Sequence, residues 1–219
     1  MIYKKTWKYI LVLNDTIEGI YRLLYRVKAL KDFSNISQGD VGGYVQGYHN
    51  LSQKGNCWVY GGKVCGHARV SENAKIKCIA YIAGAATVTE NAEVTDEVLV
   101  WGDSTVSGNA KVGGRSEISG NAHIHGNTKI SGKTRIIENA IVKGDSYISG
   151  EVDVSDNVII FGKTCISGYI TISGNSKISG TINKDIHIHN NWECFKSLYH
   201  FKDFINYPIR LLQLWFKLI

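Results

Sequence analysis

Proline is nearly absent from this chain, whereas glycine is abundant: one Pro stands against 23 Gly in 219 residues. Rigid kinks are therefore rare, and many positions can adopt conformations that a Cβ disfavours, which suits tight turns between short strands. Apolar residues make up 44% of the chain, which argues against disorder. The composition predicts a folded, β-rich protein of one domain or at most two small ones.

Paired cysteines are lacking as well. The five cysteines are odd in number and form no CxxC pair, so the sequence indicates neither a disulfide framework nor a zinc knuckle. Long apolar runs are also missing, because the stretch YILVL at 9–13 is followed at once by Asn14 and Asp15. This run is too short for the core of a signal peptide or for a membrane span. We therefore expect a cytoplasmic protein without an export signal or a membrane span, for which a membrane is the less favoured partner.

No single sign of charge dominates the middle of the chain. The net charge is +6, but thirteen Lys and Arg balance thirteen Asp and Glu over residues 63–191, so the excess of cations lies in 1–62 and 192–219. This balance excludes mimicry of DNA, which requires an acidic surface. It leaves nucleic acid or an acidic protein surface open as a partner.

The strongest pattern is a period of six residues. Between positions 64 and 178 every sixth residue is Val or Ile, in twenty positions out of twenty. This period fits neither a helix nor a long strand, so each hexad predicts a short strand and a turn, with the aliphatic side chain inward and a small residue inside the corner. Three hexads complete one triangular coil. About seven parallel coils spaced about 4.8 Å apart would form a prism on the order of 30 Å long.

The hexads VSGNAK, ISGNAH, ISGNSK and VTENAE resemble those of the hexapeptide-repeat proteins. This resemblance implies a left-handed parallel β-helix, a hand that the general crossover rule would not predict. The motifs KALKDF, GDVGGYV and GNCWVY are similar to the opening segment of uncharacterised bacterial and phage members of that group. The resemblance implies a fold rather than an activity; if a phage encodes the chain, its location would be the host cytoplasm.

The chain divides into three parts. Residues 1–56 are expected to form an N-terminal cap of strands and turns, residues 57–191 the β-helix, and residues 192–219 an amphipathic helical segment. Caps are expected because an open coil exposes strand edges and apolar core. The C-terminal segment could cover the last coil, contact a partner chain or, as an alternative, lie on a membrane surface. Its expected contact residues are Phe195, Tyr199, Trp215 and Phe216.

The sequence offers little for catalysis. Hexapeptide acyltransferases use a His, often beside an extruded loop, and twenty uninterrupted hexads leave no such loop. His123 and His125 flank Ile124 and should both point outward, without a third ligand for zinc. Cys165 has no His or carboxylate beside it that would activate a thiolate. We therefore predict no enzyme, no cofactor and no metal site.

Two outer surfaces are candidates for binding. Equivalent residues of successive coils should stack on one another, which aligns exposed apolar side chains into a stripe that is typical of a protein interface. The predicted interface residues are Tyr81, Leu99, Trp101 and Ile137 on one face and Ile141, Ile159 and Phe161 around the next corner. A predicted basic patch of five cations around Glu117 could hold nucleic acid or an acidic surface. Its residues are Lys111, Arg115, Lys129, Lys133 and Arg135.

These features together predict a rigid, non-catalytic binding or scaffold protein that acts through flat faces and self-associates, most simply as a homodimer. One alternative is an inhibitor encoded by a phage or mobile element that docks on a host nucleoprotein, such as a nucleic-acid-guided defence nuclease. A hexapeptide acyltransferase is the third possibility. In the first two cases the partner is a protein, either a second copy or a host protein.

Overall fold

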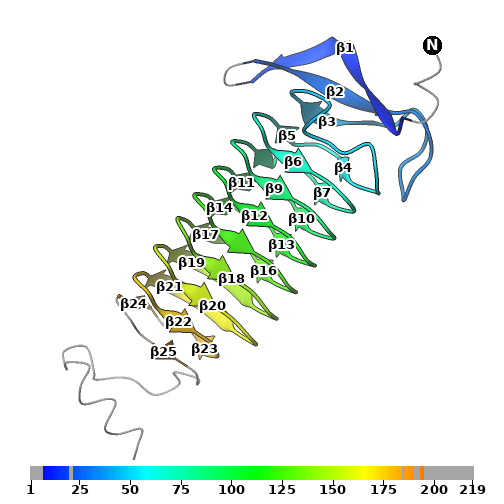
Figure 1. Ribbon diagram of the computed structural model, residues 1–219. Coiled ribbons are helices and arrows are strands. Elements are labelled where there is room, and N and C mark those ends of the chain that lie inside the picture. The colour runs from blue at the N-terminus through cyan, green and yellow to red at the C-terminus, as the bar shows by residue number, and fades with distance from the viewer. Residues whose placement is uncertain (1–6, 20–21, 184, 190–192, 195–219) are drawn as a thin grey trace, which may run out of the picture.

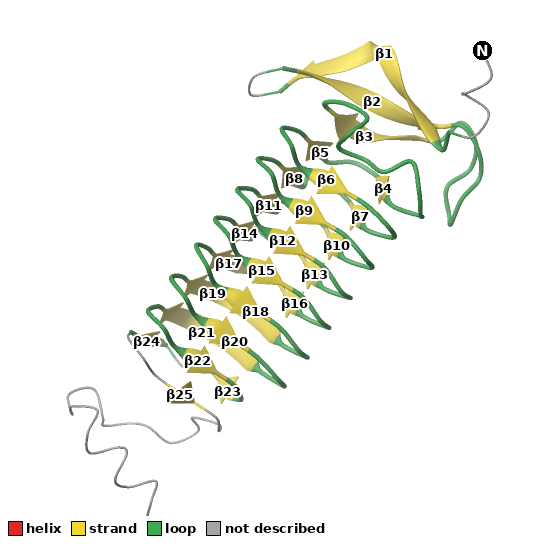
Figure 2. Cartoon of the chain, viewed as in Figure 1, coloured by secondary structure: helices red, strands yellow, loops and turns green. Residues whose placement is uncertain are grey.

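The chain is described by a computed structural model for residues 7–19, 22–183, 185–189 and 193–194. These residues are all-β, with no helix among them, and they form a β-solenoid of about eight turns of parallel stacked strands (Figures 1 and 2). The predicted all-β fold and parallel β-helix are therefore confirmed. The solenoid has about eight turns rather than the seven that the uninterrupted hexads supply.

Three walls enclose the core, and each coil contributes one strand or part of a strand to every wall. The first wall contains β5 (Lys63–Val64), β8 (Tyr81–Ile82), β11 (Leu99–Val100), β14 (Glu117–Ile118), β17 (Lys133–Ile136), the second halves of β19 (Tyr147–Val154) and β21 (Cys165–Ile172), and β24 (Ile186–Ile188). The second wall contains β6 (Arg69–Val70), β9 (Thr87–Val88), β12 (Thr105–Val106), β15 (His123–Ile124), β18 (Ile141–Val142), β20 (Ile159–Ile160), β22 (Lys177–Ile178) and β25 (Glu193–Cys194). The third wall contains β4 (Trp58–Val59), β7 (Lys75–Ile76), β10 (Glu93–Val94), β13 (Lys111–Val112), β16 (Lys129–Ile130), the first halves of β19 and β21, and β23 (Thr181–Ile182).

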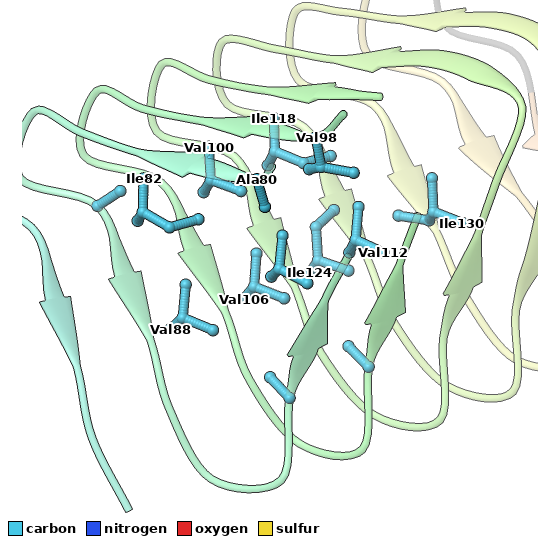
Figure 3. Packing of buried hydrophobic residues seen from close by; sticks show 14 of the residues in the cluster. Ala80, Ile82, Val88, Val98, Val100, Val106, Val112, Ile118, Ile124 and Ile130 are labelled. Atoms are coloured by element: carbon cyan, nitrogen blue, oxygen red, sulfur yellow. The ribbon is translucent and has the colours of Figure 1, made fainter. Parts of the chain in front are cut away.

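All twenty predicted inward side chains lie in the interior, each between 0% and 2% exposed. Figure 3 shows a part of this interior that includes Ile82, Ile124 and Ile130. The twenty residues are Val64, Val70, Ile76, Ile82, Val88, Val94, Val100, Val106, Val112, Ile118, Ile124, Ile130, Ile136, Val142, Ile148, Val154, Ile160, Ile166, Ile172 and Ile178. Each contributes about 1.5–3 kcal/mol by leaving water, and conformational entropy opposes most of the sum. Because every coil contacts only its neighbours, stability is shared along the prism.

Acidic residues replace glycine at several corners. Most corners carry a glycine with positive φ, but Glu90, Asp96 and Asp156 have φ of 58°, 61° and 60°. The carboxylate of each accepts a hydrogen bond, at 2.7 to 2.8 Å, from the backbone N–H of the glycine one coil later. This charge-assisted bond offsets the cost of the left-handed conformation, which is about 1–2 kcal/mol for a residue with a Cβ.

Two asparagine ladders run along the corners that flank the second wall. Each side-chain amide donates to the side-chain oxygen of the next coil, with N–O distances of 2.7 to 3.2 Å. One ladder contains Asn56, Asn73, Asn91, Asn109 and Asn127 and ends on Asp145, and the other contains Asn121, Asn139, Asn157 and Asn175. The ladders fix the register of neighbouring coils, because a slip by a single position would break every rung.

The first and last coils depart from the hexad spacing. Parallel stacking already begins at β3 (Val41–Val45), which pairs with β5, and continues through a bridge between Leu51 and Val70. This coil lies largely within the segment that the sequence assigns to the cap. At the other end, Cys165 pairs with Thr181, where the regular period would place Asn183, so the last coil is shorter.

An antiparallel hairpin of β1 (Tyr9–Glu18) and β2 (Leu23–Ala29) covers the N-terminal end, and β2 pairs with β3. Side chains occupy the hydrogen-bonding groups on the outer edge of β1. The Gln53 amide accepts from the Tyr9 N–H and donates to the Tyr9 carbonyl, and the Tyr48 hydroxyl accepts from the Leu11 N–H at 3.3 Å. Such blocking protects an edge strand from pairing with another chain.

Beneath the hairpin lies a buried polar cluster on the apolar core. The Lys8 side chain is 1% exposed, and its Nζ donates to the Cys57 carbonyl at 2.9 Å and approaches the Cys57 Sγ at 3.3 Å. Burial lowers the pKa of Lys8 and raises the pKa of Cys57. Burial also raises the pKa of Tyr9, whose hydroxyl donates to the Leu51 carbonyl.

The buried Tyr9 hydroxyl predicts a loss of stability in alkali. Since the folded state holds this pKa above the unfolded value of 10.0, the unfolded chain releases its proton first, and stability falls as the pH rises through 10. Tyr9→Phe removes this dependence but loses a hydrogen bond worth about 1 kcal/mol at neutral pH. Urea unfolding at pH 8 and pH 11 should therefore show the deficit of Tyr9→Phe shrinking or reversing at the higher pH. The exposed control Tyr169→Phe should follow the wild type at both pH values, and an unchanged Tyr9→Phe deficit would contradict the prediction.

The predicted C-terminal helix and its contact residues Phe195, Tyr199, Trp215 and Phe216 lie outside the described residues.

Candidate functional site

The apolar stripe on the first wall is centred on Trp101. Tyr81 and Leu99 are partners in register on β8 and β11, and Trp101 follows β11 directly. Trp101 is 45% exposed, and its indole Nε1 donates to the Glu117 carboxylate at 3.1 Å. Ala83 and Ser119 occupy the same outward position on the neighbouring coils, so the indole stands between two small side chains.

Ile79 belongs beside this stripe, although it is not among the predicted interface residues. It lies at the corner that precedes Tyr81 and is 69% exposed, more than any predicted interface residue. A Cβ on Gly61, one coil earlier, would lie 2.2 Å from the Cys78 carbonyl oxygen, so that corner requires glycine and carries no side chain next to Ile79. The signal was present in the sequence as the adjacent Gly61 and Gly62, which stand one coil before Ile79.

The structure divides the seven predicted interface residues between two walls. Ile137 lies on the first wall with Tyr81, Leu99 and Trp101, but Ile141 and Ile159 are partners on the second wall, beyond the corner. Phe161 follows Ile159 on the second wall. Apart from Trp101, all of these residues are half-buried. The first wall therefore carries the more continuous apolar surface.

Three of the five cations in the predicted basic patch are paired with carboxylates. Arg115 bonds Glu97 at 3.0 Å, Lys133 bonds Glu151 at 2.6 Å, and Arg135 contacts Asp153 at 3.5 Å. Each carboxylate lies one full coil away from its cation. The predicted excess of five cations over one anion is therefore too large, because it left out the neighbouring coils.

Lys111 and Lys129 remain without an ion-pair partner among the described residues. They are partners in register on β13 and β16, so two like charges lie side by side on the third wall. Beside them the wall is hollowed into a depression of about 230 Å³, which Glu93, Thr95, Gly113, Ser131 and Tyr147 also line. This volume is below the roughly 300–1,000 Å³ of sites that enclose a small molecule. The Asp96 carboxylate lies against Gly113, where a Cβ would come within 2.9 Å of its Oδ2.

The histidines that flank Ile124 are exposed, as predicted. His123 and His125 both point to solvent on the second wall. Within the described residues, no three His, Cys, Asp or Glu side chains group closely enough to hold a metal ion. Cys165 is half-buried in β21 beside Tyr147, its partner in register.

No family model matches this chain, and no curated protein matches it. In the described part of the chain, no helix is long and apolar enough to cross a membrane. The functional argument therefore depends on the geometry of the walls.

Proposed function

We propose that this protein is a rigid, non-catalytic binding protein that pairs with a second copy of itself through the first wall. One observation supports this most: twenty successive inward residues are buried without interruption, so the coils between them keep continuous outer walls. The shallow depression on the third wall offers neither the depth nor an acid–base pair that catalysis needs.

A second copy is the partner that best fits the first wall. Trp101 projects next to the small residue Ala83, so one outward column contains both a knob and a recess that could receive it, whereas Ser119 on the other side is only 4% exposed. An antiparallel two-fold pairing places the knob of each copy against the recess of the other, which is the self-complementarity that an isologous interface requires. Leu99, Tyr81 and Ile79 extend the apolar contact area around the indole.

Trp101→Glu is expected to dissociate this dimer. A buried Trp at the centre of an interface typically contributes about 2 kcal/mol or more, so the dissociation constant should rise by about thirtyfold or more. Sedimentation velocity over a range of concentrations measures this shift directly.

The matched control is Tyr169→Glu, which places the same charge on an aromatic residue that is 66% exposed at a corner far along the prism. This variant should sediment like the wild type. A wild-type protein that stays monomeric at high concentration, or a Trp101→Glu variant that dimerises like it, would refute the proposal.

A further inference from the structure

A basic stripe runs along the third wall, on the side of the prism that the proposed dimer leaves open. The register of the parallel strands places Lys75, Glu93, Lys111, Lys129 and Tyr147 in one outward column on five successive coils. Lys77 lies beside this column and bonds Glu93 at 2.7 Å, so the single anion of the column is already neutralised. The stripe therefore carries a net positive charge.

The two central lysines are an unfavourable pair as they stand. Like charges directly opposite each other on neighbouring strands are destabilising, and at other points of the predicted basic patch a carboxylate of the next coil compensates the cation. Lys111 and Lys129 form no such ion pair among the described residues, and Glu93, the in-register neighbour of Lys111, is bonded to Lys77. An anionic group placed between the two lysines would relieve this repulsion.

The surroundings of this pair favour phosphate over carboxylate. Both free cations are lysines, which bind phosphate as point charges, whereas the two arginines of the patch, whose forks suit carboxylates, already contact Glu97 and Asp153. Ser131 also lines the depression, whereas the Thr95 hydroxyl is turned to Asp96, to whose carboxylate it donates at 3.3 Å. Hydroxyl side chains commonly bond phosphate oxygens in protein complexes with nucleic acid.

Tyr147 adds an aromatic surface to the stripe. It is the partner in register of Lys129, it lines the depression, and it is 44% exposed. Sequence-neutral recognition of single strands combines a basic track with aromatic side chains on which bases stack. The column spans four intervals of about 4.8 Å, or roughly 20 Å, the scale of the shortest single-strand sites, which cover about four nucleotides.

We propose that the third wall binds single-stranded nucleic acid, with a phosphate held between the side chains of Lys111 and Lys129 and an adjacent base stacked on Tyr147. The shallow depression suits one phosphate group rather than a whole ligand, and the flat wall lets the strand continue along the column. This inference is independent of the dimer, because Trp101 lies on a different wall.

Fluorescence anisotropy tests the proposal with the full chain and a labelled oligothymidylate of about eight nucleotides, titrated at several salt concentrations. We expect binding at low salt with a dissociation constant of about 10⁻⁴–10⁻⁵ M. The double variant Lys111→Ala/Lys129→Ala should weaken binding by about tenfold and reduce the salt slope by about 1.4. Tyr147→Ala should weaken binding by about fivefold or more.

The matched control is Lys143→Ala/Lys163→Ala, which removes the same charge from exposed positions away from the stripe. It should bind nearly as the wild type does, and thermal melts of all variants should coincide. Three outcomes would overturn the proposal: no binding by the wild type at low salt, an equal loss in the control, or polyglutamate binding that depends on Lys111 and Lys129, which indicates an acidic protein partner. Trp101→Glu should bind the oligonucleotide unchanged, so failure of the dimer and failure of this site are separable.

Discussion

Ile124→Asp is expected to abolish the cooperative fold of the central coils, while His123→Asp, one residue earlier on the same strand, should leave the protein folded. Ile124 is 0% exposed and lies among aliphatic side chains, so the new carboxylate would be buried without a partner. An unpaired buried charge costs several kcal/mol, a large fraction of a typical total stability of about 5–15 kcal/mol. Circular dichroism and limited proteolysis measure the outcome.

The control separates burial from charge. His123 is exposed on the outer face of β15, so the same carboxylate there stays in water and should change stability by about 0.5 kcal/mol or less. Because coils interact only with their neighbours, proteolysis of Ile124→Asp should cut the middle of the prism first. A variant that melts and resists protease like the wild type would show that position 124 does not face a common interior.

Gly43→Ala is expected to detach the N-terminal hairpin from the solenoid. A Cβ at Gly43 would lie 2.1 Å from the Gly61 carbonyl oxygen and 2.4 Å from the Gly62 carbonyl oxygen. Both obstacles are backbone atoms, so the methyl group fits only if β3 moves away from the neighbouring coil. We expect a loss of about 3 kcal/mol or more, since the change overpacks a tight junction and disturbs β3 pairing.

Gly47→Ala is the matched control, because its Cβ would meet only the movable His49 ring, at 3.0 Å. Hydrogen exchange should show faster exchange of the amides of β1, β2 and β3 in Gly43→Ala, with the distant coils unaffected. Equal exchange in both variants would mean that the backbone approach at Gly43 is not tight.

The interior of the solenoid could be predicted from the sequence because one physical rule governs it. A position that recurs once per hexad and is always Val or Ile indicates side chains that all face one common interior. All twenty such residues are buried. The first coil was missed because its inward residues Val45, Leu51 and Val59 are unevenly spaced along the chain. The loops of this coil contact the N-terminal hairpin, and their lengths therefore depart from the six-residue period.

The outer surfaces were harder to predict because exposure depends on neighbours that lie a whole coil away along the chain. The alignment of Tyr81 with Leu99 followed from the period, since each hexad triplet returns to the same wall. The pairing of Arg115 with Glu97 obeys the same interval, but Glu97 lies one coil before the cations of the patch, so the sequence of their own two coils does not reveal it. The prominence of Ile79 depends on a missing side chain at Gly61, and hydrophobicity alone does not reveal it.

The asparagine ladders also make the length of this molecule adjustable in whole units. Each rung joins equivalent residues of two successive coils, so a duplicated coil would add one more rung, one more layer of core and one more row on every outer surface. An insertion of any other size would leave amides without partners along the corner. We therefore expect such a chain to change its length by duplication or deletion of complete coils, and a longer version would present longer outer walls.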